Sequence, residues 1–122
     1  MGRHVLLIED EPNITEAMRF ILARDGWTVS SHADGATAVN AVSRAKPDVV
    51  VLDVMLPGKS GYDILRELRA NPDTEGLPIM MLTARGQVKD RERAESFGVS
   101  HFMTKPFSNR EVLDTLNSLL DP

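Results

Sequence analysis

Four short apolar runs in this sequence end in polar side chains. The runs VLLI, VVVL, IMML and HFMT are followed by Glu9 with Asp10, by Asp53, by Thr83 and by Lys105, respectively. Two ionised carboxylates about 4 Å apart repel by about 4 kcal/mol at an effective dielectric constant near 20, so three that meet at one place need protons or a cation. Because the chain has no cysteine, an all-oxygen ligand set favours a hard dication such as Mg²⁺.

Together these groups have the composition of a site that forms an aspartyl phosphate. Asp53 supplies a carboxylate nucleophile, two further acids can hold a metal, and a hydroxyl and an ammonium group can contact phosphoryl oxygens. Each signal alone has a simpler interpretation. The acidic residues 9–11 suit the start of a helix, Thr83 suits a cap, and Lys105 suits a solvated surface charge. The site therefore depends on a fold that brings the groups together.

Apolar runs and amphipathic stretches alternate along the chain, and this alternation predicts the fold class. We expect strands at residues 5–9, 27–32, 48–53, 78–83 and 101–105. Helical periodicity follows each strand, at residues 12–25, 38–45, 64–68, 87–97 and 112–120. Strands that alternate with helices indicate an α/β fold with a parallel sheet, right-handed crossovers and helices on both faces. Such sheets bind ligands at the carboxyl ends of their strands, where the polar residues lie.

The strand and helix signals differ in strength. The run at 27–32 is more polar than the other strands, so we expect it at an edge of the sheet. The fourth helix is polar and weakly patterned, and Val88, Ala94 and Phe97 are its best candidates for apolar contacts. In the last helix, Ser108 and Glu111 match a capping box.

Length and composition narrow the class of protein. The chain has 122 residues, of which 42% are hydrophobic and 26% charged, values typical of one globular domain with a real core. Its net charge of −4 and its scattered basic residues argue against direct binding of nucleic acid or a membrane surface. The apolar run near the N-terminus is too short for a signal peptide or a membrane helix, so a cytoplasmic location is expected.

Four segments resemble the motifs of the response-regulator receiver domain, the phosphoacceptor module of two-component signalling. They occur in the family's order and at the expected strand ends, over nearly the whole chain: IEDE (8–11), VLDVMLPGKSGYD (51–63), MLTAR (81–85) and TKPF (104–107). The resemblance implies a flavodoxin-like, doubly wound sheet of five strands in the order 2-1-3-4-5, with five helices. It also implies a single receiver domain over residues 1–122, which acts as a regulatory phosphoacceptor rather than as an enzyme on other substrates.

The resemblance assigns a role to each residue of the proposed site. Asp53 would accept a phosphoryl group from a phosphohistidine of a histidine kinase or a histidine phosphotransfer protein. Glu9 and Asp10, with the Asp53 carboxylate and the backbone carbonyl of Met55, would hold Mg²⁺, for which Mn²⁺ could substitute. Thr83 would contact the phosphoryl oxygens, as would the lysine at position 105.

Three further positions acquire expectations from the family. Phe102 stands at the switch aromatic, and because it has no hydroxyl we expect packing alone to hold its inward state; a plain core aromatic is the alternative. Met55 and Arg85 flank the path of the attacking water and would set the phosphoryl lifetime. The Lys105–Pro106 bond could be cis, although most X–Pro bonds are trans.

Phosphorylation would shift the face formed by the fourth helix, fifth strand and fifth helix between inactive and active states. The segment GVSHF (98–102) lacks the acidic pair of many DNA-binding relatives, and Thr115 stands where they often have arginine, although Arg91 and Glu111 could still pair. We therefore expect a monomer or a phosphorylation-promoted dimer. We expect no output domain within residues 1–122, so a downstream protein partner or a missing output domain would receive the signal. The chain could be stand-alone, excised from a longer regulator or designed.

Other classes of protein remain as alternatives. A Mg²⁺-dependent phosphohydrolase would use the same groups but needs a second acid where this chain has Met55. A flavin- or nucleotide-binding module would need a phosphate loop rich in glycine or in serine and threonine where residues 9–12 read EDEP. A receiver-like interaction module that never carries phosphate would not need Asp53, Thr83 and Lys105.

Overall fold

A computed structural model describes residues 2–84 and 88–121, and strands and helices alternate along them. The strands are β1 (His4–Ile8), β2 (Thr28–His32), β3 (Val49–Asp53), β4 (Ile79–Thr83) and β5 (His101–Thr104). The helices are α1 (Pro12–Arg24), α2 (Ala38–Ala45), which follows the short 3-10 helix η1 (Gly35–Thr37), α3 (Gly61–Ala70), α4 (Val88–Ser96) and α5 (Asn109–Leu120). The strands form one parallel sheet in the order β2-β1-β3-β4-β5. This arrangement confirms the predicted flavodoxin-like fold.

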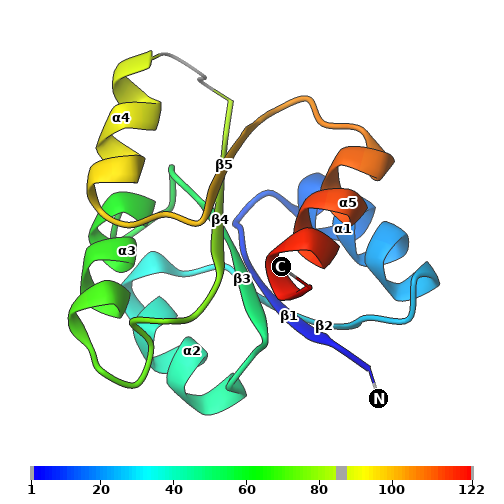
Figure 1. The fold of residues 1–122 in the computed structure, drawn as a ribbon, viewed down its shortest axis with the longest axis horizontal. Helices are drawn as coiled ribbons and strands as arrows, with labels where there is room; N and C mark the ends of the chain where they lie inside the picture. Colours follow the sequence, from blue (N-terminus) through cyan, green and yellow to red (C-terminus); the bar gives the residue numbers. More distant parts are fainter. Residues whose placement is uncertain (1, 85–87, 122) are drawn as a thin grey trace.

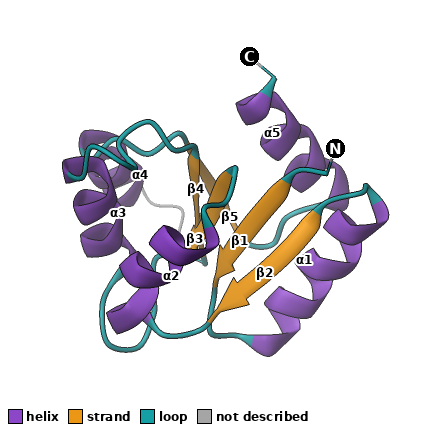
Figure 2. Cartoon of the chain, turned by 90° about the horizontal axis from the view of Figure 1, so that it is seen from below, coloured by secondary structure: helices purple, strands orange, loops and turns teal. Residues whose placement is uncertain are grey.

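The sheet lies between two layers of helices. Helices α2, α3 and α4 cover one face, and α1 and α5 cover the other (Figure 1). Successive side chains of a strand point to opposite faces. On β1, Leu6 and Ile8 accordingly join the core beneath α2 and α3, whereas Val5 and Leu7 join the core beneath α1 and α5. Figure 2 shows β1 and β2 side by side, with α1 and α5 on one side of the sheet and α2, α3 and α4 on the other.

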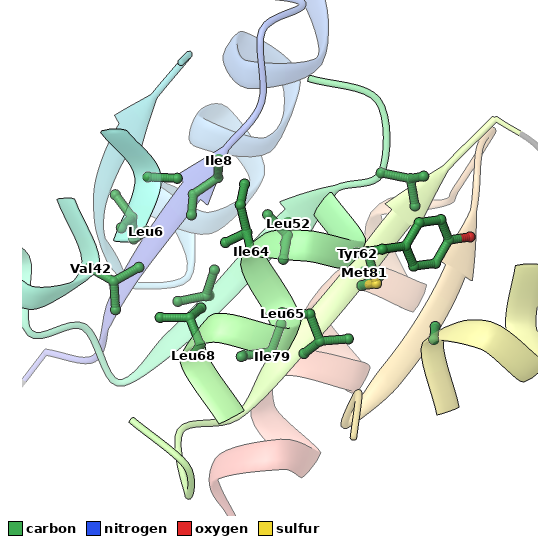
Figure 3. Close-up of a cluster of buried hydrophobic side chains, with 14 of the residues drawn as sticks. Leu6, Ile8, Val42, Leu52, Tyr62, Ile64, Leu65, Leu68, Ile79 and Met81 are labelled. Carbon is green, nitrogen blue, oxygen red and sulfur yellow. The ribbon is translucent and has the colours of Figure 1, made fainter. Parts of the chain in front are cut away.

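The core on the α2–α3 face combines strand and helix side chains in one cluster. Figure 3 shows this cluster, to which α3 contributes Ile64, Leu65 and Leu68 and β4 contributes Ile79 and Met81. All five of these side chains are fully buried. Helix α3 begins at an N-cap, where the Ser60 hydroxyl accepts a hydrogen bond from the backbone N–H of Asp63. The cap and the apolar stripe together fix the direction of α3 away from the end of β3.

Strand burial follows the position of each strand in the sheet. Every residue of β3 and β4 is buried, as continuous apolar runs in the middle of a parallel sheet require. Strand β2 has no buried residue and lies at an edge, as its polar sequence predicts. The first predicted strand is shifted by one residue, because β1 ends at Ile8 and Glu9 follows it.

The helices confirm some sequence predictions and correct one. Pro12 begins α1, and the Ser108–Glu111 capping box is present at α5. In α4 only Ala94 is buried, with Phe97 packed against the same core just after the helix. Val88 is 71% exposed, so its prediction as an apolar contact is wrong: it faces solvent at the first residue of α4. No helix in residues 2–84 and 88–121 combines the length and the apolarity needed to cross a membrane.

Candidate functional site

Three carboxylates meet at the carboxyl ends of β1 and β3. The two strands are neighbours in register, with Ile8 opposite Leu52, so the residues that follow are brought side by side. Glu9, Asp10 and Asp53 each offer an oxygen, and these three oxygens lie within 4.8 Å of one another. Glu9 and Asp53 are buried at 5% and 3% exposure, and Asp10 is exposed. The sheet thus assembles the acidic cluster that the sequence predicts.

Lys105 reaches the same cluster from the end of β5. Its Nζ lies 3.4 Å from Oε2 of Glu9 and 3.8 Å from Oδ1 of Asp53. A third acid, Glu11, places its Oε1 3.5 Å from the same Nζ. Burial lowers the pKa of Lys105, but the surrounding carboxylates outweigh it and the net shift is upward. The lysine therefore stays cationic and offsets part of the negative charge.

The remaining charge is costly because the acids are buried. Burial is the main reason that the pKa of Glu9 is raised to about 7, and the charge of Asp53 adds to it, although the backbone N–H of Glu11 donates to Glu9 Oε1 at 3.1 Å. Burial likewise raises the pKa of Asp53 in spite of the charge of Lys105. The charge of one lysine therefore does not bring the pKa values of the two buried carboxylates back to their ordinary range.

The donor set fits a hard cation. Oε2 of Glu9 is buried and accepts no hydrogen bond, although it faces Lys105. A buried carboxylate oxygen without a donor is unfavourable unless a cation binds it. A cavity of about 310 Å³ opens beside Glu9 and Asp10, and His32 also lines it. Oxygen ligands next to open space suit Mg²⁺, which keeps several waters when it binds to proteins.

Thr83 and Phe102 lie on the two strands beyond Asp53. Thr83 ends β4 at 3% exposure, and its backbone carbonyl accepts a hydrogen bond of 2.7 Å from the N–H of Lys105. The Lys105–Pro106 bond that follows is cis. Phe102 is buried on β5 opposite Met81 and points into the α2–α3 core. Arg85, a predicted lifetime residue, lies outside the described residues.

The comparisons with known proteins agree with this geometry. The family model described as "Response regulator receiver domain" matches residues 5–117. The chain belongs to the response regulator receiver domain family. Receiver domains are signalling phosphoacceptors, and the acidic cluster of Glu9, Asp10 and Asp53 fits phosphorylation and metal binding.

Three known proteins are similar to this chain over nearly all of its length. It is 44% identical over 116 residues to the probable transcriptional regulatory protein TcrX of Mycobacterium tuberculosis, covering 95% of this chain and 49% of TcrX. A putative response regulator from Chloroflexus aurantiacus has the same fold, with a TM-score of 0.95 and 29% identity over the whole of both chains. The receiver domain of the sensor histidine kinase PA1611 from Pseudomonas aeruginosa, solved with magnesium in its active site cleft, matches at a TM-score of 0.91 and 32% identity over the whole of both chains. The chain spans about half the length of the curated relatives it matches.

The loop after Asp53 is held against the site by a close backbone approach. The N–H of Gly61 donates to the carbonyl of Val54 at 2.9 Å. A Cβ atom at Gly61 would lie 2.2 Å from the carbonyl oxygen of Asp53, so this position accepts no side chain. Met55, between them, is 75% exposed and its N–H lies 3.4 Å from Oδ1 of Asp53. The requirement for glycine at 61 is a feature that sequence reasoning missed, because nothing in the sequence signals this approach.

Two other contacts of the receiver domain are not predicted by the sequence. Glu11 was considered only as part of a helix start, yet it is a partner of Lys105. Phe102 was expected to be held by packing alone, but the guanidinium carbon of Arg91 lies 5.5 Å from the centre of its ring. Within the described residues no ion pair joins Arg91 to Glu111 in the single chain, and their pairing between two copies in a dimer stays a prediction. Both contacts join residues from different elements, which local patterns do not reveal.

Proposed function

We propose that Asp53 accepts a phosphoryl group from a phosphohistidine of a histidine kinase or histidine phosphotransfer protein. The observation that carries this proposal is the meeting of three carboxylates and one lysine around the end of a fully buried central strand. A carboxylate that only capped a turn would need neither burial nor a partly buried lysine beside it. Membership of the receiver family supports the same role.

In the proposed reaction a carboxylate oxygen of Asp53 attacks phosphorus. A P–O bond forms as the P–N bond to the donor imidazole breaks, and the leaving imidazole takes a proton from solvent. Glu9 and Asp10, with the carbonyl of Met55, would complete a Mg²⁺ or Mn²⁺ site that neutralises charge on the phosphoryl oxygens. Such neutralisation also favours the ionised, nucleophilic form of Asp53 over the protonated form that burial promotes.

Lys105 and Thr83 would then hold the transferred group. The Lys105 ammonium is already 3.8 Å from Asp53 and can exchange a carboxylate partner for a phosphoryl oxygen. The Thr83 hydroxyl, at the end of β4, would move toward a second phosphoryl oxygen. Its movement would alter the packing of Phe102 and so bias the face formed by α4, β5 and α5 between two states. Met55 and Arg85 would set the lifetime of the acyl phosphate by controlling access of water.

The wider role follows from this switch. We propose that residues 1–122 act as a single receiver domain in the cytoplasm, as a monomer or as a dimer promoted by phosphorylation. Because TcrX, a probable transcriptional regulator, is about twice as long, the signal would pass to an output domain or to a separate protein partner. The chain would promote only its own phosphorylation and dephosphorylation, and would bind neither nucleic acid nor membrane directly.

Incubation with acetyl phosphate and Mg²⁺ tests the proposal. We expect an intact-mass gain of one phosphoryl group that is lost in alkali, that needs the metal and that Asp53→Asn abolishes. Asp114→Asn, which changes an exposed acid on α5, is the matched control and should keep the gain. Absence of any gain with acetyl phosphate or a phosphohistidine donor would instead favour an interaction module. Multiple-turnover release of phosphate from a small ester would favour a phosphohydrolase.

A further inference from the structure

Helix α4 has almost no apolar attachment to the rest of the domain. Its sequence, VKDRERAES, buries Ala94 alone, and Val88 at its start is 71% exposed. A surface helix normally docks through an apolar stripe about 100° wide, which this helix lacks. Some other interaction must therefore hold α4 against α3 and β5.

Arginine side chains over aromatic rings supply that interaction. The guanidinium carbon of Arg93 lies 4.2 Å from the centre of the Tyr62 ring on α3. The Tyr62 hydroxyl donates to the backbone carbonyl of Asp90 at 3.4 Å, which brings the same ring against the first turn of α4. In Figure 3 Tyr62 lies at the edge of the core cluster, beside Met81. A guanidinium group over a ring face is attracted by the ring's negative quadrupole.

The second contact involves the ring of Phe102. Arg91, also on α4, places its guanidinium carbon 5.5 Å from the centre of this ring. Among residues 2–84 and 88–121, no carboxylate lies within ion-pair distance of Arg91. Its guanidinium group therefore contacts the Phe102 ring rather than an acid. Phe102 is 5% exposed and belongs to the same buried cluster as Met81 and Ala94. Rotation of the ring out of the core would therefore break both its packing and its contact with α4.

We propose that Arg91 is a positioning residue that couples the inward ring of Phe102 to the docked position of α4. The ring and the helix hold each other in place, so a change at one is passed to the other. The coupling rests on the proposed function in one respect, because it transmits phosphorylation only if Phe102 responds to the state of Asp53. The contact between Arg91 and Phe102 can also be tested on its own, by measurements that involve no phosphorylation.

The matched pair Arg91→Gln and Arg93→Gln separates coupling from simple docking. Both variants remove one guanidinium group from α4, but only Arg91 touches Phe102, whereas Arg93 touches Tyr62. In protein labelled with ¹³C at methionine methyl groups, the Met81 signal reports the ring current of Phe102, its neighbour across β4 and β5. We expect Arg91→Gln to move this signal toward its position in Phe102→Leu, Arg91→Lys to move it less, and Arg93→Gln to leave it nearly unchanged.

Binding of beryllofluoride with Mg²⁺, a phosphoryl mimic, measures the link to the acidic site. We expect the dissociation constant to rise by about three- to tenfold in Arg91→Gln and by less than about twofold in Arg93→Gln. In a Phe102→Leu background, Arg91→Gln should have no further effect, because the coupling partner is gone. Equal effects of the two arginine variants, or an effect of Arg91→Gln that persists without Phe102, would overturn the inference. If the wild type fails to bind the mimic, the proposed function fails, and the Met81 signals still decide whether Arg91 holds the ring.

Discussion

The two ends of the sheet differ in how their charged side chains are partnered. Near the amino ends of β4 and β5, the Arg69 guanidinium donates hydrogen bonds of 2.7 to 3.3 Å to four backbone carbonyls and one hydroxyl, those of Thr74, Glu75, Leu77, Gly98 and Ser100. No carboxylate pairs with it among the residues that the structure describes. At the carboxyl ends of β1 and β3, buried carboxylates face one another, and one oxygen of Glu9 accepts no hydrogen bond.

The contrast between Arg69 and the acidic cluster indicates that one end of the sheet stabilises the fold and the other is suited to bind ligands. Arg69 joins the end of α3 to the loops that lead into β4 and β5, so its hydrogen bonds stabilise the fold without a ligand. Burial makes the charged forms of Glu9 and Asp53 unfavourable, and a proton or a bound cation relieves that cost. Carboxylate oxygens that are to bind a metal and a phosphoryl group cannot already be occupied by hydrogen-bond donors of the protein. The hydrogen bonds of Arg69 at the opposite end of the sheet help to offset this loss of stability.

The largest effect is expected from a side chain at the close approach beside Asp53. Gly61→Ala would place a Cβ atom 2.2 Å from the Asp53 carbonyl, so the loop must shift. We expect a loss of about 3 kcal/mol in the free energy of unfolding, measured by urea denaturation. Gly76→Ala is the control, because a Cβ atom at Gly76 meets nothing within 4 Å. Equal stability of the two variants would show that this end of the sheet tolerates movement.

Removal of the arginine at the opposite end should cost slightly less. Arg69→Met keeps most of the apolar stem but removes the donors to five acceptors, so we expect a loss of about 2–3 kcal/mol. Arg44→Met, at an exposed position on α2, should change stability by less than about 0.5 kcal/mol. If Arg69→Met matched this control, the contrast between the two ends would be lost.

Stability without metal should fall as the pH rises, because of the acidic end. The pKa of Glu9 is raised to about 7, above its ordinary value, so the folded state holds this proton more tightly than the unfolded state. The resulting stability is present at low pH and is lost between about pH 4.5 and 8, by on the order of 1–2 kcal/mol. Chemical denaturation in EDTA across this range measures it. Glu9→Gln should flatten the profile, and an unaltered profile in that variant would assign the dependence elsewhere.

Replacement of Asp53, the proposed phosphoacceptor, by a neutral residue should stabilise the metal-free protein. Since burial raises the pKa of Asp53, its charged form is unfavourable, and Asp53→Asn should add about 1 kcal/mol at pH 8 in EDTA. With excess Mg²⁺ the wild type should gain stability and the variant should gain little. A destabilised Asp53→Asn protein in EDTA would mean that attraction to Lys105 outweighs the burial of the acid.

The smallest effect is expected at the exposed side of the site. Met55 is 75% exposed beside Asp53, where a bulky apolar side chain can obstruct water. We expect Met55→Asn to speed loss of the phosphoryl group by a few-fold, equivalent to about 1 kcal/mol in the barrier. The decay of phosphorylated protein after removal of the donor measures this rate. A rate equal to that of the wild type would remove Met55 from control of the lifetime.

The sequence predicted the acidic end of the sheet much better than the opposite end. Apolar runs that end in acids place Glu9 and Asp53 correctly, because parallel strands bring their carboxyl ends together. Arg69 escaped notice because its acceptors are backbone carbonyls, which have no signature in the sequence. The prediction for Val88 failed because α4 has too few apolar residues to define a buried face.

Chemical trapping of the acyl phosphate tests the central claim, that the acidic end exists to phosphorylate Asp53. Protein treated with acetyl phosphate and Mg²⁺ is reduced with borohydride, digested and mapped by mass spectrometry. Reduction converts an aspartyl phosphate to homoserine at the modified position. The account predicts homoserine at position 53, only when both donor and metal are present. Homoserine at Asp10 or at another aspartate, or a phosphorylated protein with no change at position 53, would contradict it.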